Sequence, residues 1–194
     1  MIKAVILDLN GVFIKSPRLS DGFSEKFNVP KDDFLIALKS VMAMARLPNA
    51  GDSFELWKAY LDKWGLSLSK EDFFDFWFTS ESEVSDMINL AGELKHRKIK
   101  IFIVSNNFKE RTDYYDKTFP FIKEIAEKVY YSWQTGLLKP DEKAYKLILT
   151  ENNLAPEECL YFDDSEENVN VASRLGIKSF IFKSSEDVRS KCSI

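Results

Sequence analysis

The feature that most constrains this chain is a short apolar segment that ends at a polar residue and recurs along the sequence. Runs rich in Val, Ile and Phe that stop in this way are typical of buried strands in a parallel sheet. The segments are residues 5–7 before Asp8, 99–104 before Ser105, 159–162 before Asp163-Asp164, and 179–182 before Lys183.

The segments between these strands have helical character. We predict helices over residues 87–95, 141–150 and 168–175. The basic Arg97-Lys98 pair suits the end of the first, Pro140 precedes the second, and Gly176 is placed to terminate the third. Strand and helix in alternation predict an α/β fold, a doubly wound parallel sheet of Rossmann-like type with helices on both faces.

Residues 15–82 interrupt this alternation. They hold amphipathic stretches over 32–46, 54–64 and 71–78, and Ser69 is placed to cap the last of these. We therefore predict an inserted all-helical domain at 15–82, and a core domain of 1–14 and 83–194. Most of the insertion's aromatic side chains are expected to pack against one another and the remainder to line a substrate pocket. They are Phe54, Trp57, Tyr60, Trp64, Phe73, Phe74, Phe76 and Trp77.

Composition excludes several classes of protein. The net charge of −4 provides no basic surface for nucleic acid, and no apolar run reaches the ~20 residues of a membrane span. Cys159 and Cys192 lack the spacing of a disulfide framework, and the sequence shows no signal-peptide pattern, so we predict a cytoplasmic protein. The single histidine, His96, is predicted to be solvated near a helix end, which argues against histidine-based catalysis.

Polar residues at the strand ends predict a binding site. Ligands of doubly wound sheets bind beyond the carboxyl ends of the strands, where Asp8, Ser105 and the Asp163-Asp164 pair are expected to meet. Lys139 is expected at the same edge. Taken singly, Lys139 is more often a solvated surface lysine, and Ser105 or the acidic pair could cap the helices that follow them. Together these groups are costly unless they serve each other or a ligand, and Mg²⁺ with a phosphate group would satisfy them.

The order of these motifs resembles the signature of the haloacid dehalogenase superfamily. The resemblance covers residues 1–14 and 83–194, and an α-helical cap after the first motif fits the same group. The C-terminal half is similar to sugar-phosphate phosphatases and to the N-terminal phosphatase domain of soluble epoxide hydrolases. The motifs are Asp8-Leu9-Asn10-Gly11-Val12, Ser105-Asn106-Asn107, Lys139-Pro140, and Asp163-Asp164 with Asn168.

The resemblance implies a role for each motif. Asp8 would be the nucleophile that forms an aspartyl-phosphate, and Asn168 would orient the acidic loop. Ser105, the main-chain amide of Asn106 and Lys139 would bind and stabilise the transferring phosphoryl group. The ligands of Mg²⁺ would be Asp8, the Asn10 carbonyl, Asp163 and Asp164.

Asn10 departs from the pattern of these phosphatases, which have a second Asp at this catalytic position. That Asp protonates the leaving alcohol and then activates water, and an amide can do neither. General acid–base help of ~10²–10⁴-fold is therefore expected to be missing. Three interpretations stay open: a weakened enzyme, a phosphate-binding protein without turnover, or an Asp-to-Asn substitution introduced to trap a complex.

The sequence thus predicts a Mg²⁺-dependent phosphomonoesterase that acts on a small phosphorylated metabolite. One alternative is a phosphate-binding or regulatory module without catalysis, which Asn10 favours. The other is a 2-haloacid dehalogenase, which attacks carbon through an Asp and needs no metal. The paired acids favour a cation and hence the phosphatase. The sequence does not indicate an oligomeric state or a substrate.

Overall fold

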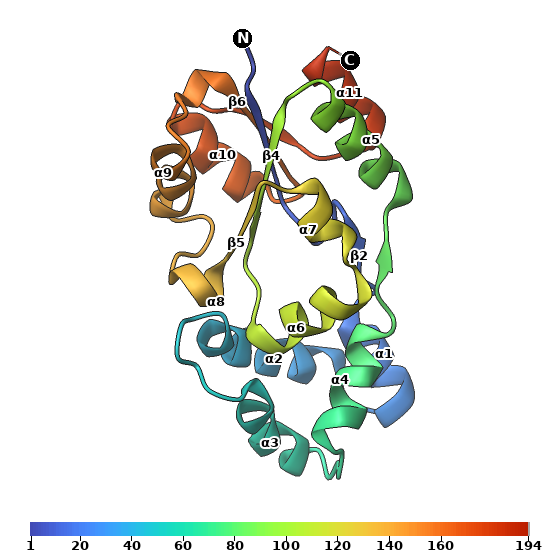
Figure 1. Cartoon of the computed structure of the whole chain (residues 1–194). Coiled ribbons are helices and arrows are strands. Elements are labelled where there is room, and N and C mark those ends of the chain that lie inside the picture. Colours follow the sequence, from blue (N-terminus) through green and yellow to red (C-terminus); the bar gives the residue numbers. More distant parts are fainter. Residues whose placement is uncertain (194) are drawn as a thin grey trace.

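Five parallel strands form the central sheet of the protein, which a computed structural model describes over residues 1–193. The order across the sheet is β5-β4-β1-β6-β7, so the first strand lies in the centre (Figure 1). Leu7 pairs with Ile103 on one side and with Phe162 on the other. The strands are β1 Ala4–Leu7, β4 Lys100–Ser105, β5 Lys128–Tyr131, β6 Cys159–Asp163 and β7 Lys178–Ile181.

Helices cover both faces of this sheet, as predicted for a doubly wound fold. Val5 and Leu7 of β1 face one hydrophobic core, and Ala4 and Ile6 face the other, because side chains alternate along a strand. The first core is covered by α5 Ser85–His96, α6 Lys109–Thr118, α7 Phe121–Ile125 and α11 Ser185–Cys192. The second is covered by α9 Glu142–Glu151 and α10 Glu166–Arg174, and α8 Ser132–Thr135 and the 3₁₀ helix η1 Pro156–Glu158 lie in the connections.

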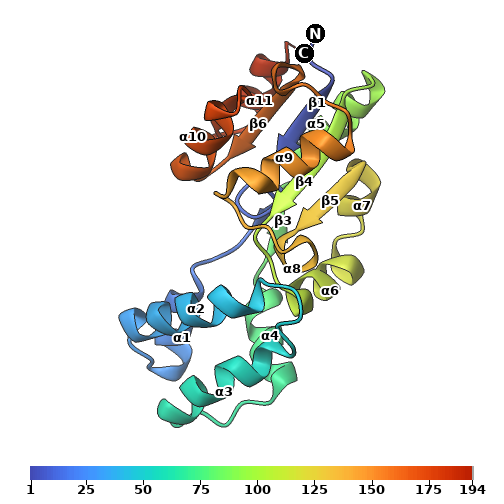
Figure 2. The same cartoon turned by 90° about the vertical axis from the view of Figure 1, so that its left-hand side faces the viewer.

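A separate helical unit lies beyond the carboxyl ends of the strands (Figures 1 and 2). Two short strands, β2 Ile14–Lys15 and β3 Ser82–Glu83, pair antiparallel where the chain leaves the sheet and returns to it. The helices between them are α1 Leu19–Phe27, α2 Lys31–Ala45, α3 Ser53–Lys63 and α4 Lys70–Phe78. The fold is therefore a Rossmann-like core with an inserted helical cap, while the domain boundary at 15–82 stays a prediction.

The cap has its own aromatic core. Trp57 and Phe73 are fully buried at its centre, with ring centroids 5.1 Å apart, and Phe34 stacks on Trp57 at 5.5 Å. The remaining aromatic residues that the sequence singled out pack into or against this cluster, so the prediction of core packing is confirmed. Phe108, which precedes α6 of the core domain, is buried in the same cluster and joins the two units.

The structure also contains elements that the sequence patterns did not predict. Helix α1 was missed because Gly22 and two serines weaken its helical signal, and β5 was missed because its four residues include only one β-branched side chain. The predicted helices all begin within two residues of their observed starts, and Ser69 caps α4 by accepting from the Asp72 amide.

Three smaller predictions can be compared directly with the structure. His96 is exposed at the end of α5. Cys159 and Cys192 are both free thiols. Within residues 1–193, no helix has the length and apolar character that crossing a membrane requires.

Candidate active site

The predicted meeting of polar side chains takes place at the carboxyl edge of the sheet. Asp8 follows the central strand β1, and Lys139 reaches it from the loop before α9, with Nζ 2.9 Å from Asp8 Oδ1. The same Nζ lies 2.6 Å from Asp163 Oδ2 at the end of β6. Lys139 is only 5% exposed, which excludes the surface-lysine interpretation. Groups 131 residues apart in the chain therefore form one buried ionic cluster.

Asp163 is held entirely by donors of the protein. Its Oδ2 accepts from Lys139 and from the Tyr161 hydroxyl, and its Oδ1 accepts from the Ser165 amide and Asn168 Nδ2, both at 2.9 Å. The Lys139 ammonium is the first of the groups that lower the pKa of Asp163 against the opposing effect of burial. Ser165, rather than the acidic pair, is the N-cap of α10. Asp163 thus anchors Lys139 and the acidic loop.

Asp8 is the most perturbed carboxyl group of the site. Burial raises its pKa to about 6, and the neighbouring Asp163 charge acts in the same direction, while Lys139 opposes both. Its Oδ1 also accepts a hydrogen bond of 2.7 Å from the Leu9 amide. A carboxylate fixed at a strand end by a cation and a main-chain amide is suited to act as an oriented nucleophile.

The acidic groups are arranged so that they can hold a metal ion. One carboxylate oxygen from each of Asp8, Asp163 and Asp164 lies within 4.8 Å of the others. Burial and then the Asp163 charge raise the pKa of Asp164, as expected for acids gathered without a counter-ion. Gly11, at φ +90°, leaves the space for this group, because a Cβ atom there would overlap Asp164 Oδ2. A set of hard oxygen donors in one place fits Mg²⁺.

Asn106, in the motif that ends β4, has a role that the sequence did not reveal. Its side chain forms two hydrogen bonds with the backbone of Lys139, donating to the carbonyl at 2.7 Å and accepting from the amide at 2.8 Å. Ser105 ends β4, is buried, and does not cap α6, whose first flanking residue is Phe108. The loop after β4 therefore positions the lysine across the sheet edge.

These groups surround a cavity of about 280 Å³. Two arginines line it that the sequence did not indicate, because neither belongs to a motif. One of them, Arg46, ends helix α2 of the cap. Among the described residues, no cap aromatic side chain lines this cavity, and the expectation that some of them line a substrate pocket stays a prediction. The lining residues are Asp8, Asn10, Arg46, Ser105, Asn106, Arg111, Lys139, Asp164 and Asn168.

The Asn10 side chain is held in a hydrogen-bond chain with a defined direction. The Phe108 amide donates to Asn107 Oδ1 at 3.1 Å, so Asn107 Nδ2 must be the donor to Asn10 Oδ1 at 3.3 Å. Asn10 Nδ2 then donates to the Tyr115 hydroxyl at 2.7 Å. Both ends of the amide are in use, which suits an amide at this position.

The second arginine, Arg111 of α6, ties the cap hinge to the core. Its guanidinium pairs with Glu81 before β3 and donates to Ser16 Oγ after β2 at 3.0 Å. Ser16 in turn donates to Glu81 at 2.8 Å. The Arg111 and Glu81 side chains are both buried, and this interaction fixes both connecting segments where they pass the site.

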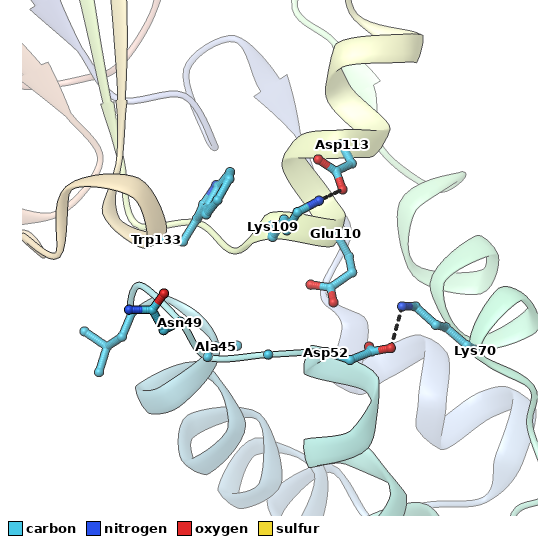
Figure 3. Close-up of a pocket in the computed structure, with 11 residues that line it drawn as sticks. Ala45, Asn49, Asp52, Lys70, Lys109, Glu110, Asp113 and Trp133 are labelled. Carbon is cyan, nitrogen blue, oxygen red and sulfur yellow. Dashed lines mark hydrogen bonds and ion pairs between the residues drawn. The ribbon is translucent and has the colours of Figure 1, made fainter.

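A further contact between cap and core lies at the loop between α2 and α3, next to Glu110 of α6 (Figure 3). Glu110 of α6 accepts from the Ser53 amide at 2.9 Å and from its hydroxyl at 2.7 Å, at the start of α3. Beside it is an open pocket of about 480 Å³, bordered by Trp133 and by the Asp52–Lys70 ion pair. This pocket shares no lining residue with the cavity at Asp8.

A doubly wound core, a helical cap and an acidic cluster at the first strand define a capped hydrolase fold. The family model for haloacid dehalogenase-like hydrolases matches residues 22–182. The chain therefore belongs to the haloacid dehalogenase-like hydrolases, as its motifs indicated.

Three characterised proteins have related sequences. Acyl-CoA dehydrogenase family member 10 of Mus musculus is 24% identical over 90% of this chain, D-ribitol-5-phosphate phosphatase of Bacteroides thetaiotaomicron 25% over 38%, and bifunctional epoxide hydrolase 2 of Rattus norvegicus 26% over 50%. The matched regions span 17%, 35% and 18% of those proteins. The chain therefore corresponds to only a part of each relative.

The fold itself is found in a solved enzyme of the same family. A HAD family enzyme from Bacteroides thetaiotaomicron superposes with a TM-score of 0.82 at 23% identity, covering 98% of both chains. Its structure in complex with magnesium and inorganic phosphate superposes with a TM-score of 0.78, at 23% identity over 94% of this chain and 95% of that one. A protein with the same fold has therefore been solved with both magnesium and inorganic phosphate bound.

Proposed function

We propose that this protein is a Mg²⁺-dependent phosphatase that hydrolyses a small phosphorylated metabolite through an aspartyl-phosphate at Asp8. The observation that carries the proposal is the buried cluster in which Lys139 Nζ lies 2.9 Å from Asp8, next to Asp164. An anchored carboxylate, a buried ammonium and a set of oxygen ligands are what a phosphoryl transfer requires. The related phosphatase and the magnesium–phosphate complex support the same reading.

In this proposal, residues of the core domain attack phosphorus, bind the phosphoryl oxygens and hold the metal. Asp8 attacks phosphorus in line, while Lys139, Ser105 and the Asn106 amide take the phosphoryl oxygens. The metal is held by Asp8, the Asn10 carbonyl and Asp164. Asp163 already accepts four hydrogen bonds, so it anchors Lys139 and the acidic loop beside the metal ligands. Bound Mg²⁺ supplies charge neutralisation for the phosphoryl oxygens.

The two alternatives predict different chemistry at the same residues. A 2-haloacid dehalogenase would need no metal. Burial and, to a lesser extent, the Asp163 charge raise the pKa of both Asp8 and Asp164, so a bound cation would stabilise their charged forms. A binding module would keep the phosphate cradle but show no turnover. Asn10 is the feature that favours this second alternative.

The test is phosphate release from a panel of phosphorylated metabolites, with Mg²⁺ and with excess chelator. We expect activity that needs Mg²⁺ and is abolished in Asp8→Asn, while Asp86→Asn, an exposed carboxylate of α5, leaves it unchanged. Chelator-resistant release of halide from a 2-haloacid would establish the dehalogenase. Phosphate binding by calorimetry without turnover of any substrate would establish the module.

A further inference from the structure

The Arg46 guanidinium is the most unusual group in the cavity. Its Nε is buried, and within residues 1–193 it meets no hydrogen-bond acceptor. Its head group also forms no ion pair with any carboxylate of the described chain. An N–H group of a cation that is removed from water without a partner is costly, so such a group indicates a missing anion.

The charges around the cavity show which cation is available to bind that anion. Lys139 is neutralised between Asp8 and Asp163, and Arg111 is neutralised by Glu81. Burial and the Arg111 charge lower the pKa of Arg46, and the Asp8 charge opposes them, so the guanidinium lies within range of both. Among the described residues that line the cavity, Arg46 is therefore the cation left for a ligand.

The direction of attack assigns a position to this ligand. Asp8 approaches phosphorus from the sheet edge, and in-line displacement places the leaving oxygen on the opposite side. The cap lies on that side of the strand ends, and Arg46 is its one contribution to the cavity lining in the described chain. Arg46 therefore borders the cavity from the side on which the leaving group departs.

Among the described residues that line the cavity, no carboxyl group is free to protonate that leaving oxygen, and Lys139 is already assigned to the phosphoryl oxygens. Position 10 carries an amide engaged by Tyr115 and Asn107. The two carboxyl groups that line the cavity, Asp8 and Asp164, serve as nucleophile and metal ligand in the proposed function. The leaving group must then depart as an oxyanion.

We propose that the substrates are phosphoryl donors with a stable anionic leaving group, namely acyl phosphates or phosphoanhydrides, and that Arg46 binds the departing anion in place of a proton donor. The inference rests on the proposed function and narrows its substrate class. A guanidinium stabilises an oxyanion through charge-assisted hydrogen bonds without any proton transfer. A poor leaving group such as an alkoxide would still need an acid.

Both steps balance without an acid at position 10. In the first, a bond forms between Asp8 Oδ and phosphorus, the bond from phosphorus to the leaving oxygen breaks, and its electron pair leaves with the carboxylate or phosphate anion. In the second, water adds to phosphorus and the bond to Asp8 breaks. Both protons of the water stay on the released dihydrogen phosphate, and Asp8 returns as a carboxylate.

The test compares leaving groups in the wild-type protein with Mg²⁺ present. We expect kcat/KM for acetyl phosphate and pyrophosphate to exceed that for a simple alkyl phosphate by ~10²–10⁴-fold, the size of the absent acid contribution. Across substituted phenyl phosphates, kcat/KM should fall steeply as the phenol becomes less acidic. Phosphoglycolate, an alkyl phosphate with a carboxylate, tests whether a second anion alone suffices and should remain slow.

Variants then measure the contribution of the Arg46 side chain. Arg46→Met should lower kcat/KM for acetyl phosphate by ~10²–10³-fold and steepen the dependence on phenol acidity, because an electrostatic contact to the transition state is removed. Arg46→Lys should recover part of the loss. Lys39→Met, which removes an exposed cation from the same helix, should behave as wild type. Thermal melts exclude misfolding as the cause.

The outcomes separate the two levels of the proposal. If phosphoglycolate or a simple alkyl phosphate is hydrolysed as fast as acetyl phosphate, or Arg46→Met leaves the acidity dependence unchanged, the leaving-group inference is overturned and the phosphatase stands. If no substrate in either class releases phosphate, the proposed function itself fails.

Discussion

Replacing Asn10 with Asp would restore the acid–base group that related phosphatases carry at this position. The structure indicates that the new carboxylate fits. In the wild type, Asn107 Nδ2 lies 3.3 Å from Asn10 Oδ1 and the Tyr115 hydroxyl lies 2.7 Å from Asn10 Nδ2. The two oxygens of the new carboxylate would take these positions and accept from both groups. Tyr115 must then donate to this carboxylate, whereas at present its hydroxyl accepts from Asn10 Nδ2.

The expected magnitude follows from these contacts. Reversing one hydrogen bond costs about 1 kcal/mol of folding free energy, so the variant should remain folded. General acid help of ~10²–10⁴-fold corresponds to about 3–5 kcal/mol of activation free energy. For alkyl phosphates the full factor should appear in kcat/KM. For acetyl phosphate the first step should change little, because its leaving group needs no proton.

The assay combines steady-state phosphate release with acid-quenched intact-protein mass spectrometry. In the wild type, acetyl phosphate should produce a burst and an accumulated aspartyl-phosphate, because no base activates the water that hydrolyses the intermediate. In Asn10→Asp the burst should disappear, since the carboxylate accelerates hydrolysis of the intermediate. Asn170→Asp, which adds the same charge on the exposed side of α10, controls for a general charge effect.

One result would refute this reasoning. If Asn10→Asp melts like the wild type and still binds Mg²⁺, yet hydrolyses alkyl phosphates no faster, then position 10 does not reach the leaving oxygen. The module interpretation would gain support if both forms bind phosphate and neither turns over.

Three further predictions concern the architecture around the site. Gly11→Ala should abolish the Mg²⁺-induced rise in melting temperature, because its Cβ would overlap Asp164 Oδ2; an unchanged rise would place the ion elsewhere. Glu81→Gln leaves the buried Arg111 charge uncompensated and should cost about 3–5 kcal/mol of unfolding free energy by chemical denaturation, and a loss under about 1 kcal/mol would contradict the buried pair. Burial raises the pKa of Asp8 to about 6, so its carboxyl group takes up a proton as the pH falls through that value, and stabilisation of the fold by Mg²⁺ should be full above this pH and decline below it. Melting curves with and without Mg²⁺ across this pH range measure the effect. Equal stabilisation above and below it would exclude Asp8 as a ligand.

The sequence alone determined the core fold and the acidic site. Short apolar runs with polar ends specify parallel strands, and parallel strands deliver their ends to one edge whatever lies between them. Asp8, Ser105 and Asp164 could therefore be assigned to one edge from the strand pattern, and the order of the motifs added Lys139 to the same site. The aromatic packing of the cap was readable for a similar reason, because helical periodicity is a local property.

Tertiary structure decided which groups complete the site. Arg46 carries no motif and ends an ordinary amphipathic helix, and its place in the cavity depends on how the hinge segments set the cap over the strand ends. Two other contacts join residues about 30 positions apart: the hydrogen bonds of Asn106 with the Lys139 backbone, and the ion pair of Arg111 with Glu81. Contacts of this kind leave no periodic trace in a sequence, because packing between elements, rather than the local pattern, brings the partners together.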